Sequence, residues 1–156
     1  MAETETKARN GMAAQAMPGH VIRRLQQRSA QVFHKRMQEE GHDLTSVQFA
    51  ALDALSAHPG IDQAQLSALI AYDRATIGGV VDRLEQKGLV SRQVNPRDRR
   101  ARVLALTPAG QERYATLLPV VAALQRDILG RLDPDEYAAF MALAAKAVGL
   151  DAPDAD

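Results

Sequence analysis

The chain has 156 residues, enough for one domain with a substantial hydrophobic core. Apolar residues make up 46% of the chain, which indicates a folded protein. Aromatic residues make up only 4%, and much of the apolar content is Ala and Leu, which favours helices. The absence of cysteine excludes disulfides, cysteine-based zinc sites and thiol redox sensors. No apolar run approaches the roughly 18 residues of a membrane span and no signal-peptide core is present, so we expect a cytoplasmic protein without membrane contact.

The net charge is zero, but the charged residues are unevenly distributed along the chain. Residues 1–72 are balanced, with seven basic and seven acidic side chains. Residues 73–102 carry eight Lys or Arg against four Asp or Glu, whereas residues 103–156 carry four against eight. A polyanion responds to the local potential, so the basic segment is compatible with nucleic-acid binding despite the neutral total.

The chain opens with a polar, Ala-rich stretch, residues 1–17, which we expect to be a flexible N-terminal arm. An apolar pattern of helical period then runs from Pro18 to Gly41. A second helix is predicted from Thr45, which can form a capping box with Gln48. Both helices present one broad apolar side, so both are expected to pack against a core.

Two short helices follow, with only two residues between them. Asp62 is predicted to cap the first, and its residues Leu66, Leu69 and Ile70 are predicted to face the core. Asp73 is predicted to cap the second. Two short helices joined by so tight a turn indicate a helix-turn-helix, with the second as the recognition helix.

This recognition helix is predicted to end at Gly88, because glycine suits the left-handed C-terminal position. One face carries apolar residues at spacings of three and four, and the opposite face is small and polar. Two interior glycines, Gly78 and Gly79, cost about 1 kcal/mol each relative to Ala, which is understandable where DNA or the preceding helix approaches closely. The candidate DNA contacts of this helix are Arg74, Ala75, Thr76, Gly79, Asp82, Arg83 and Gln86.

Two short β-compatible runs, residues 89–94 and 101–106, flank the loop sequence NPRDRR. They predict a hairpin, or wing, with a cationic tip suited to phosphate or minor-groove contact. The candidate DNA contacts of the wing are Arg97, Asp98, Arg99 and Arg100. Asp82 is unusual near phosphate, and it could accept a hydrogen bond from a cytosine amine or orient Arg83 or a wing arginine.

Two longer helices complete the chain. Thr107, followed by proline, predicts the start of a long helix that Pro119 should bend. Asp133 is predicted to cap a last helix that runs to about Val148, and residues 149–156 should form an acidic tail. The first helix and these two have more apolar surface than one small winged helix can cover, so we expect a homodimer.

Residues 18–148 resemble the MarR family of bacterial winged-helix regulators. The resemblance is carried by LTSVQFAAL in the second helix, by DQAQLSALIAYDRATIGGVVDRLEQKGLVSR through the recognition helix, and by the wing sequence NPRDRRARVLALTPAG. The DxR element at 98–100, followed by LTxxG at 106–110, is quite specific to that family.

The resemblance implies a mainly α fold with a small β-hairpin wing. A winged helix-turn-helix lobe, residues 45–106, would be joined to N- and C-terminal dimerisation helices in residues 18–42 and 108–148. The resemblance further implies an obligate homodimer that places two recognition helices in successive major grooves of a pseudo-palindromic operator.

The resemblance also implies how the wing is built. Asp98 and Arg100 would pair with each other and hold the hairpin in shape. Arg97 and Arg99 would then be free for the minor groove, where narrow A·T tracts attract arginine.

The recognition-helix sequence DRATIGG resembles a branch that represses aromatic-acid catabolism, with effectors such as hydroxycinnamoyl-CoA thioesters or hydroxynicotinate. Several family members bind effectors near the start of the first helix, where this chain has His20, Arg23 and Arg24. A cation beside a histidine could hold a small aromatic carboxylate, although the three could equally be surface charges and an interface histidine. No two histidines have the spacing of a helical metal site, so we expect no metal and no cofactor.

Four functions compete. The leading hypothesis is a repressor released from double-stranded DNA by a small aromatic carboxylate or an aromatic acyl-CoA. The second is a DNA-binding regulator or architectural protein without an effector. An enzyme is not expected, because GxSxG, HExxH, P-loop and GxGxxG motifs are all absent. A winged-helix module for protein interaction predicts no basic bias on the wing, and the wing is basic.

Overall fold

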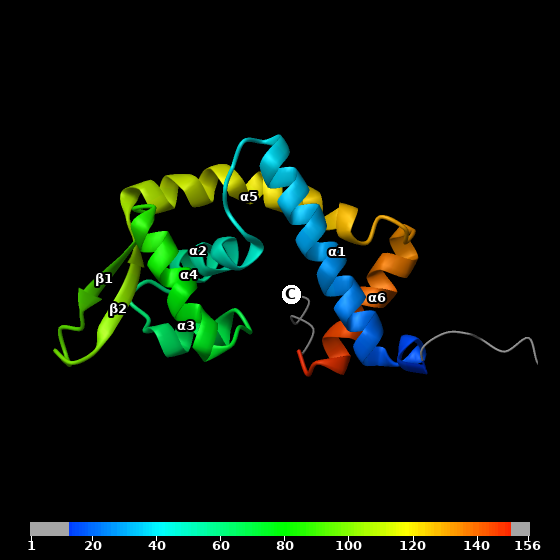
Figure 1. Ribbon diagram of the computed structural model, residues 1–156, viewed down its shortest axis with the longest axis horizontal. Helices are drawn as coiled ribbons and strands as arrows, with labels where there is room; N and C mark the ends of the chain where they lie inside the picture. The colour runs from blue at the N-terminus through cyan, green and yellow to red at the C-terminus, as the bar shows by residue number, and fades with distance from the viewer. Residues whose placement is uncertain (1–12, 151–156) are drawn as a thin grey trace, which may run out of the picture.

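The computed structural model describes residues 13–150. Figure 1 shows two parts connected by α5, which arches from the hairpin and the short helices on one side toward α1 and α6 on the other. The elements in chain order are η1 (Ala13–Ala16), α1 (Pro18–Glu39), α2 (Ser46–Ala57), α3 (Gln63–Leu69), α4 (Arg74–Gln86), β1 (Val90–Val94), β2 (Arg102–Leu106), α5 (Pro108–Ile128) and α6 (Pro134–Ala147). This order confirms the predicted fold class, mainly α with a two-stranded antiparallel hairpin. None of the helices in residues 13–150 is both long and apolar enough to cross a membrane.

Side-chain caps define where the helices begin. Thr45 and Gln48 form the predicted capping box at the start of α2, with both hydrogen bonds at 3.2 Å. Asp62 and Asp133 form the same arrangement at the starts of α3 and α6. Asp73 caps α4 as predicted. These caps bind backbone N–H groups that have no partner within their helix, so the sequence sets each starting point locally.

The hydrophobic core lies mainly between α2, α3, α4 and the hairpin, and it continues beneath α5. Leu52, Leu66, Ile77 and Leu84 are among its fully buried side chains. Met37 of α1 is also buried in it. The lobe that carries the recognition helix therefore shares one continuous core with α1 and α5.

The hairpin is held at its root by a third piece of chain. Arg92 of β1 lies opposite Leu104 of β2 in the antiparallel register. The Leu104 N–H donates to the Ile61 carbonyl at 2.8 Å, and the Leu104 carbonyl accepts from the Gly60 N–H at 2.9 Å. This short bridge before α3 was not predicted, and it fixes the outer edge of β2.

Part of the predicted N-terminal arm, residues 1–17, has regular structure. Ala13–Ala16 form a 3-10 helix, and the Met17 N–H donates to the Ala14 carbonyl at 3.0 Å. Residues 1–12 of the arm and residues 151–156 of the predicted acidic tail lie outside the described residues.

The prediction that Leu69 faces the core is wrong. Leu66 is buried and Ile70 is half-buried, but Leu69 is 52% exposed. Leu69 lines a surface groove between α2 and α3, and the α2 side of this groove includes the short side chains of Ala54 and Ala57. Alanine is too short to cover a leucine on a helix of only seven residues.

The LTxxG segment fastens the start of α5 to the end of α4. The Thr107 hydroxyl donates to the Gly88 carbonyl at 2.6 Å and accepts from the Gly110 N–H at 3.0 Å. The Thr107 N–H donates to the Leu89 carbonyl at 3.1 Å. A Cβ on Gly110 would lie 2.0 Å from the Leu89 carbonyl oxygen, so this close approach requires glycine.

We expect Gly110→Ala to lower the free energy of unfolding by roughly 1–3 kcal/mol, because the added methyl group must push two backbone segments apart. Urea denaturation measures the change. The matched control is Gly19→Ala, whose Cβ would meet only the flexible Arg23 side chain at 3.6 Å and should not destabilise the fold. Equal urea midpoints for Gly110→Ala and the wild type would show that the approach is not required.

Candidate nucleic-acid interface

The recognition helix α4 buries one face and exposes the other. Ile77, Val81 and Leu84 are buried against the core. The opposite face is exposed along its whole length, and no large apolar side chain lies on it. All seven residues predicted to contact DNA are exposed, namely Arg74, Ala75, Thr76, Gly79, Asp82, Arg83 and Gln86.

Local hydrogen bonds set the entry into α4. Asp73 accepts from the Thr76 hydroxyl, and its Oδ1 accepts from the Thr76 N–H at 3.0 Å. The bond from the Thr76 hydroxyl has the larger effect and the bond from the Thr76 N–H the smaller, and both hold the pKa of Asp73 below its usual value. The negative carboxylate lies beside the positive end of the helix. In the preceding turn, Ala71 adopts a left-handed φ of 52°, and the Ser67 hydroxyl donates to the Tyr72 carbonyl at 2.6 Å.

The two adjacent glycines of α4 have different surroundings. A Cβ on Gly78 would lie 3.3 Å from Gln63 Nε2, so this glycine allows α3 to pack closely. A Cβ on Gly79 would have no atom within 4 Å in the described structure, apart from its chain neighbours and the backbone of its own helix. Packing within the described part of the chain therefore does not account for Gly79.

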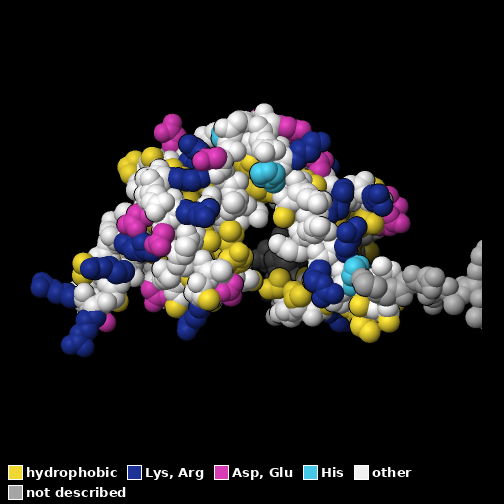
Figure 2. Space-filling view, viewed as in Figure 1, with side chains coloured by type: hydrophobic (Ala, Val, Ile, Leu, Met, Phe, Trp, Pro, Cys, Tyr) yellow, Lys and Arg dark blue, Asp and Glu magenta, His cyan; other side chains and the backbone are white. Residues whose placement is uncertain are grey.

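The tip of the wing is shaped by two Asx turns. Asn95 Oδ1 accepts from the Arg97 N–H at 2.9 Å, and Asp98 Oδ1 accepts from the Arg100 N–H at 3.0 Å. The expectation that Asp98 and Arg100 pair is thus corrected in one respect: the carboxylate binds the backbone of Arg100, because an Asx turn reaches the N–H two residues on. The Arg100 side chain joins those of Arg97 and Arg99 on the exposed tip, where Figure 2 shows basic side chains projecting from the hairpin at the lower left.

Arg92 of β1 is a residue of this interface that the sequence did not single out. Its Nη2 lies 2.6 Å from Asp82 Oδ1 and its Nη1 lies 2.5 Å from Glu85 Oε2, so one guanidinium bridges two carboxylates of α4. The hydrogen bond that Arg92 donates to Asp82, and then the one that it donates to Glu85, raises the pKa of Arg92. Of the alternatives considered for Asp82, the structure shows a pair with an arginine of the hairpin, and that arginine is Arg92 of β1. The three-residue spacing of Asp82 and Glu85 was the available signal, but only the folded hairpin shows which arginine reaches both.

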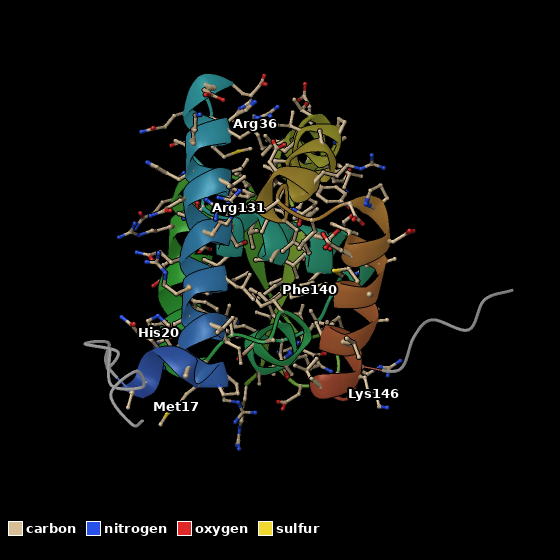
Figure 3. All side chains as sticks on the ribbon, turned by 90° about the vertical axis from the view of Figure 1, so that its right-hand side faces the viewer. Met17, His20, Arg36, Arg131, Phe140 and Lys146 are labelled. Atoms are coloured by element: carbon tan, nitrogen blue, oxygen red, sulfur yellow. The ribbon has the colours of Figure 1, made fainter. Side chains whose placement is uncertain are left out.

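The candidate effector residues His20, Arg23 and Arg24 share one face of α1, as their spacing of three and four requires. His20 is half-buried and both arginines are exposed, with Arg24 Nη1 donating to Gln27 Oε1 at 3.1 Å. Figure 3 shows His20 on the side of α1 that faces away from α6. A groove of about 530 Å³ lies between α1, α5 and α6 and is lined by other residues of α1, such as Ile22.

Comparisons with known sequences agree with this architecture. A family model described as "MarR family" matches residues 42–101, from the loop before α2 to the end of the wing loop. The transcriptional regulator HosA of Escherichia coli O111:H- is 35% identical over 136 residues, which cover 86% of this chain and 97% of HosA.

Two solved structures share both the fold and recognisable sequence. Bordetella bronchiseptica BpsR, described in terms of the regulation of its DNA binding by 6-hydroxynicotinic acid, has a TM-score of 0.79 and 29% identity, covering 94% of this chain and 99% of BpsR. The transcriptional repressor CouR, bound to a 23-mer DNA duplex, has a TM-score of 0.76 and 28% identity, covering 90% of this chain and 99% of CouR. The chain belongs to the MarR family and is a DNA-binding transcriptional regulator, not an enzyme.

Proposed function

We propose that the protein is a homodimeric repressor that leaves a pseudo-palindromic operator when a small aromatic acid, or its CoA thioester, binds. One observation carries the proposal. The lobe with the polar face of α4 and the arginine-tipped wing packs its apolar side chains into the core, whereas α6 and the first turns of α1 leave apolar side chains uncovered. The first part is suited to DNA, and the second to another copy of the chain.

The proposed dimer is supported by the exposed apolar residues of α1 and α6. Within the described structure, α6 has no buried residue. Leu143 is 68% exposed, Met141 is 48% exposed, and Ile22 of α1 is 63% exposed. Monomers rarely leave such surfaces open, and a second copy would cover them. The proposed parts are a DNA-binding lobe over 45–106 and dimerisation segments over 18–42 and 108–148.

A two-fold axis through these helices would place two copies of α4 on one side of the dimer. They would enter successive major grooves, about 34 Å apart along the duplex. Arg97, Arg99 and Arg100 extend from each wing toward the flanking minor groove, where they would meet phosphates and narrow A·T tracts. The phosphate contacts would position the protein, and the exposed face of α4 would read the bases.

An aromatic acid is supported as the effector by the description of BpsR, whose DNA binding is regulated by 6-hydroxynicotinic acid. In this chain His20, Arg23 and Arg24 form a cationic face that could hold a carboxylate. A ligand shifts the equilibrium between two dimer arrangements only by binding one of them more tightly. The preferred arrangement would be one whose recognition helices miss the half-sites.

The wing is tested with Arg99→Ala. We expect this change to weaken operator binding and to flatten the dependence of log affinity on log salt by about one unit for each phosphate that is no longer neutralised. Fluorescence anisotropy at several salt concentrations measures both quantities. Arg126→Ala, which removes an exposed arginine from α5, is the matched control. The assignment fails if Arg99→Ala binds with the affinity and the salt slope of the wild type.

Because the position of Gly79 is open, a substitution there is predicted to raise the stability of the free protein and to lower its affinity for DNA. We expect Gly79→Ala to stabilise the free protein by up to about 1 kcal/mol, because alanine is the better helix former. The same methyl group should obstruct DNA and weaken operator binding, measured by anisotropy beside thermal unfolding. Gly78→Ala points its methyl group toward α3 and serves as the control. Tighter binding by Gly79→Ala would remove this face of α4 from the interface.

The effector is tested by isothermal titration calorimetry with hydroxylated aromatic acids, 6-hydroxynicotinic acid and aromatic acyl-CoA esters. We expect one of these to bind, to release a labelled operator duplex, and to bind more weakly to Arg23→Ala. Binding of DNA without a response to any compound would instead favour the second candidate, a DNA-binding regulator without an effector. That candidate is kept because the groove between α1, α5 and α6 is not lined by His20, Arg23 or Arg24.

A further inference from the structure

The wing is anchored on both of its edges at a single level. Arg92 and Leu104 are opposite each other in the hairpin register. On the β2 edge, the backbone of Leu104 exchanges hydrogen bonds with Ile61 and Gly60 at 2.8 and 2.9 Å. On the β1 edge, the Arg92 side chain reaches across to α4. The two anchors together form the root of the wing.

Beyond this root the hairpin projects away from the rest of the molecule, as Figure 1 shows. Val94 is 48% exposed, and the loop residues 96–100 are all exposed. A hairpin that is held only at its root has its direction set by the contacts at that root. The direction of the tip relative to α4 therefore depends on the anchors at Arg92 and Leu104.

The Arg92 anchor is suited to fixing an angle. Its two terminal nitrogens bind two different carboxylates, at 2.6 Å to Asp82 and 2.5 Å to Glu85, and these carboxylates lie one turn apart on α4. A planar guanidinium held at two points resists both sliding and rotation, which a single ion pair does not. The Arg92 side chain is only 27% exposed, so it is less accessible to solvent than either carboxylate.

We infer that Arg92 is a positioning residue, whose bridge to Asp82 and Glu85 sets the direction of the wing relative to the recognition helix. The helix and the wing then engage their two grooves together rather than as independent contacts. This inference rests on the proposed placement of Arg99 in the minor groove. Arg92 would affect DNA binding only by orienting the arginines of the tip, and Arg92 itself would not contact DNA.

A double-mutant cycle between Arg92 and Arg99 tests the inference. Arg99→Ala should weaken operator binding about tenfold in the wild type, the size of one good contact, and less than about twofold when Arg92 is already alanine. Arg102→Ala removes an arginine from the same hairpin that has no ion pair among the described residues, so it is the matched control and should combine additively with Arg99→Ala. Additive losses for Arg92→Ala and Arg99→Ala would overturn the inference.

Glu85→Ala distinguishes the effect of wing orientation on DNA binding from the effect of a changed charge near DNA. It removes one of the two carboxylates and a negative charge near DNA, so charge alone predicts tighter binding. The loss of one anchor point instead predicts weaker binding and a smaller effect of Arg99→Ala. Arg92→Lys keeps the charge but not the two-point bridge, and it should restore less than half of the coupling in the cycle. Full recovery with lysine, or tighter binding by Glu85→Ala, would contradict the role.

Hydrogen exchange on the free protein gives a readout that does not depend on DNA. Arg92→Ala should speed exchange of the backbone N–H groups in 93–103 while leaving α4 unchanged, and Arg102→Ala should not. If Arg99→Ala has no effect on DNA binding by the wild type, the proposed minor-groove contact fails, and the exchange data still decide whether Arg92 holds the wing. Unchanged exchange in 93–103 would overturn the inference.

Discussion

The recognition helix depends on the hydrogen bonds between the end of α4 and the start of α5. Thr107 binds the consecutive carbonyls of Gly88 and Leu89, and Gly110 allows the two backbones to come within a distance that no side chain would permit. A second connection lies at the same end of α4, where Lys87 Nζ binds the Asp43 carbonyl at 2.5 Å and its carboxylate at 3.0 Å. Because α5 continues toward α6, which has no buried residue in the described structure, a change in packing within the proposed dimer would be transmitted to α4.

The distribution of charge over the surface matters more for DNA binding than the net charge of the chain. A net charge of zero says little about DNA binding, because the acidic residues are concentrated elsewhere or already paired. The two carboxylates on α4 that could repel phosphate, Asp82 and Glu85, are both bound by Arg92. The arginines of the tip lie beyond this cluster and are exposed. The surface offered to DNA is therefore more positive than the composition indicates.

The sequence predicted best what short-range physics decides. The caps at Thr45, Asp62 and Asp73 each depend on side chains within three residues, and all three were correct. The core face of α4 followed from its period in the same way. These features need no knowledge of the tertiary structure, so the fold class and the exposed face of the recognition helix could be read from the sequence.

What the sequence missed depends on distant neighbours. The bridge from Ile61 to Leu104 joins residues far apart in the chain, and no local pattern announces it. The exposure of Leu69 depends on the alanines with which α2 lines the same groove. In the sequence Arg92 is one basic residue among several. Its role depends on which carboxylates of α4 lie within reach, and only the folded hairpin shows this.

The central claim is that two copies of the chain present two recognition helices to one operator. Sedimentation equilibrium of the protein with a fluorescent duplex, selected by the protein from a random pool, tests it most directly. The account predicts a dimer in free solution at micromolar concentration and two chains on each duplex. A monomer at that concentration, or a single chain bound to each duplex, would contradict it.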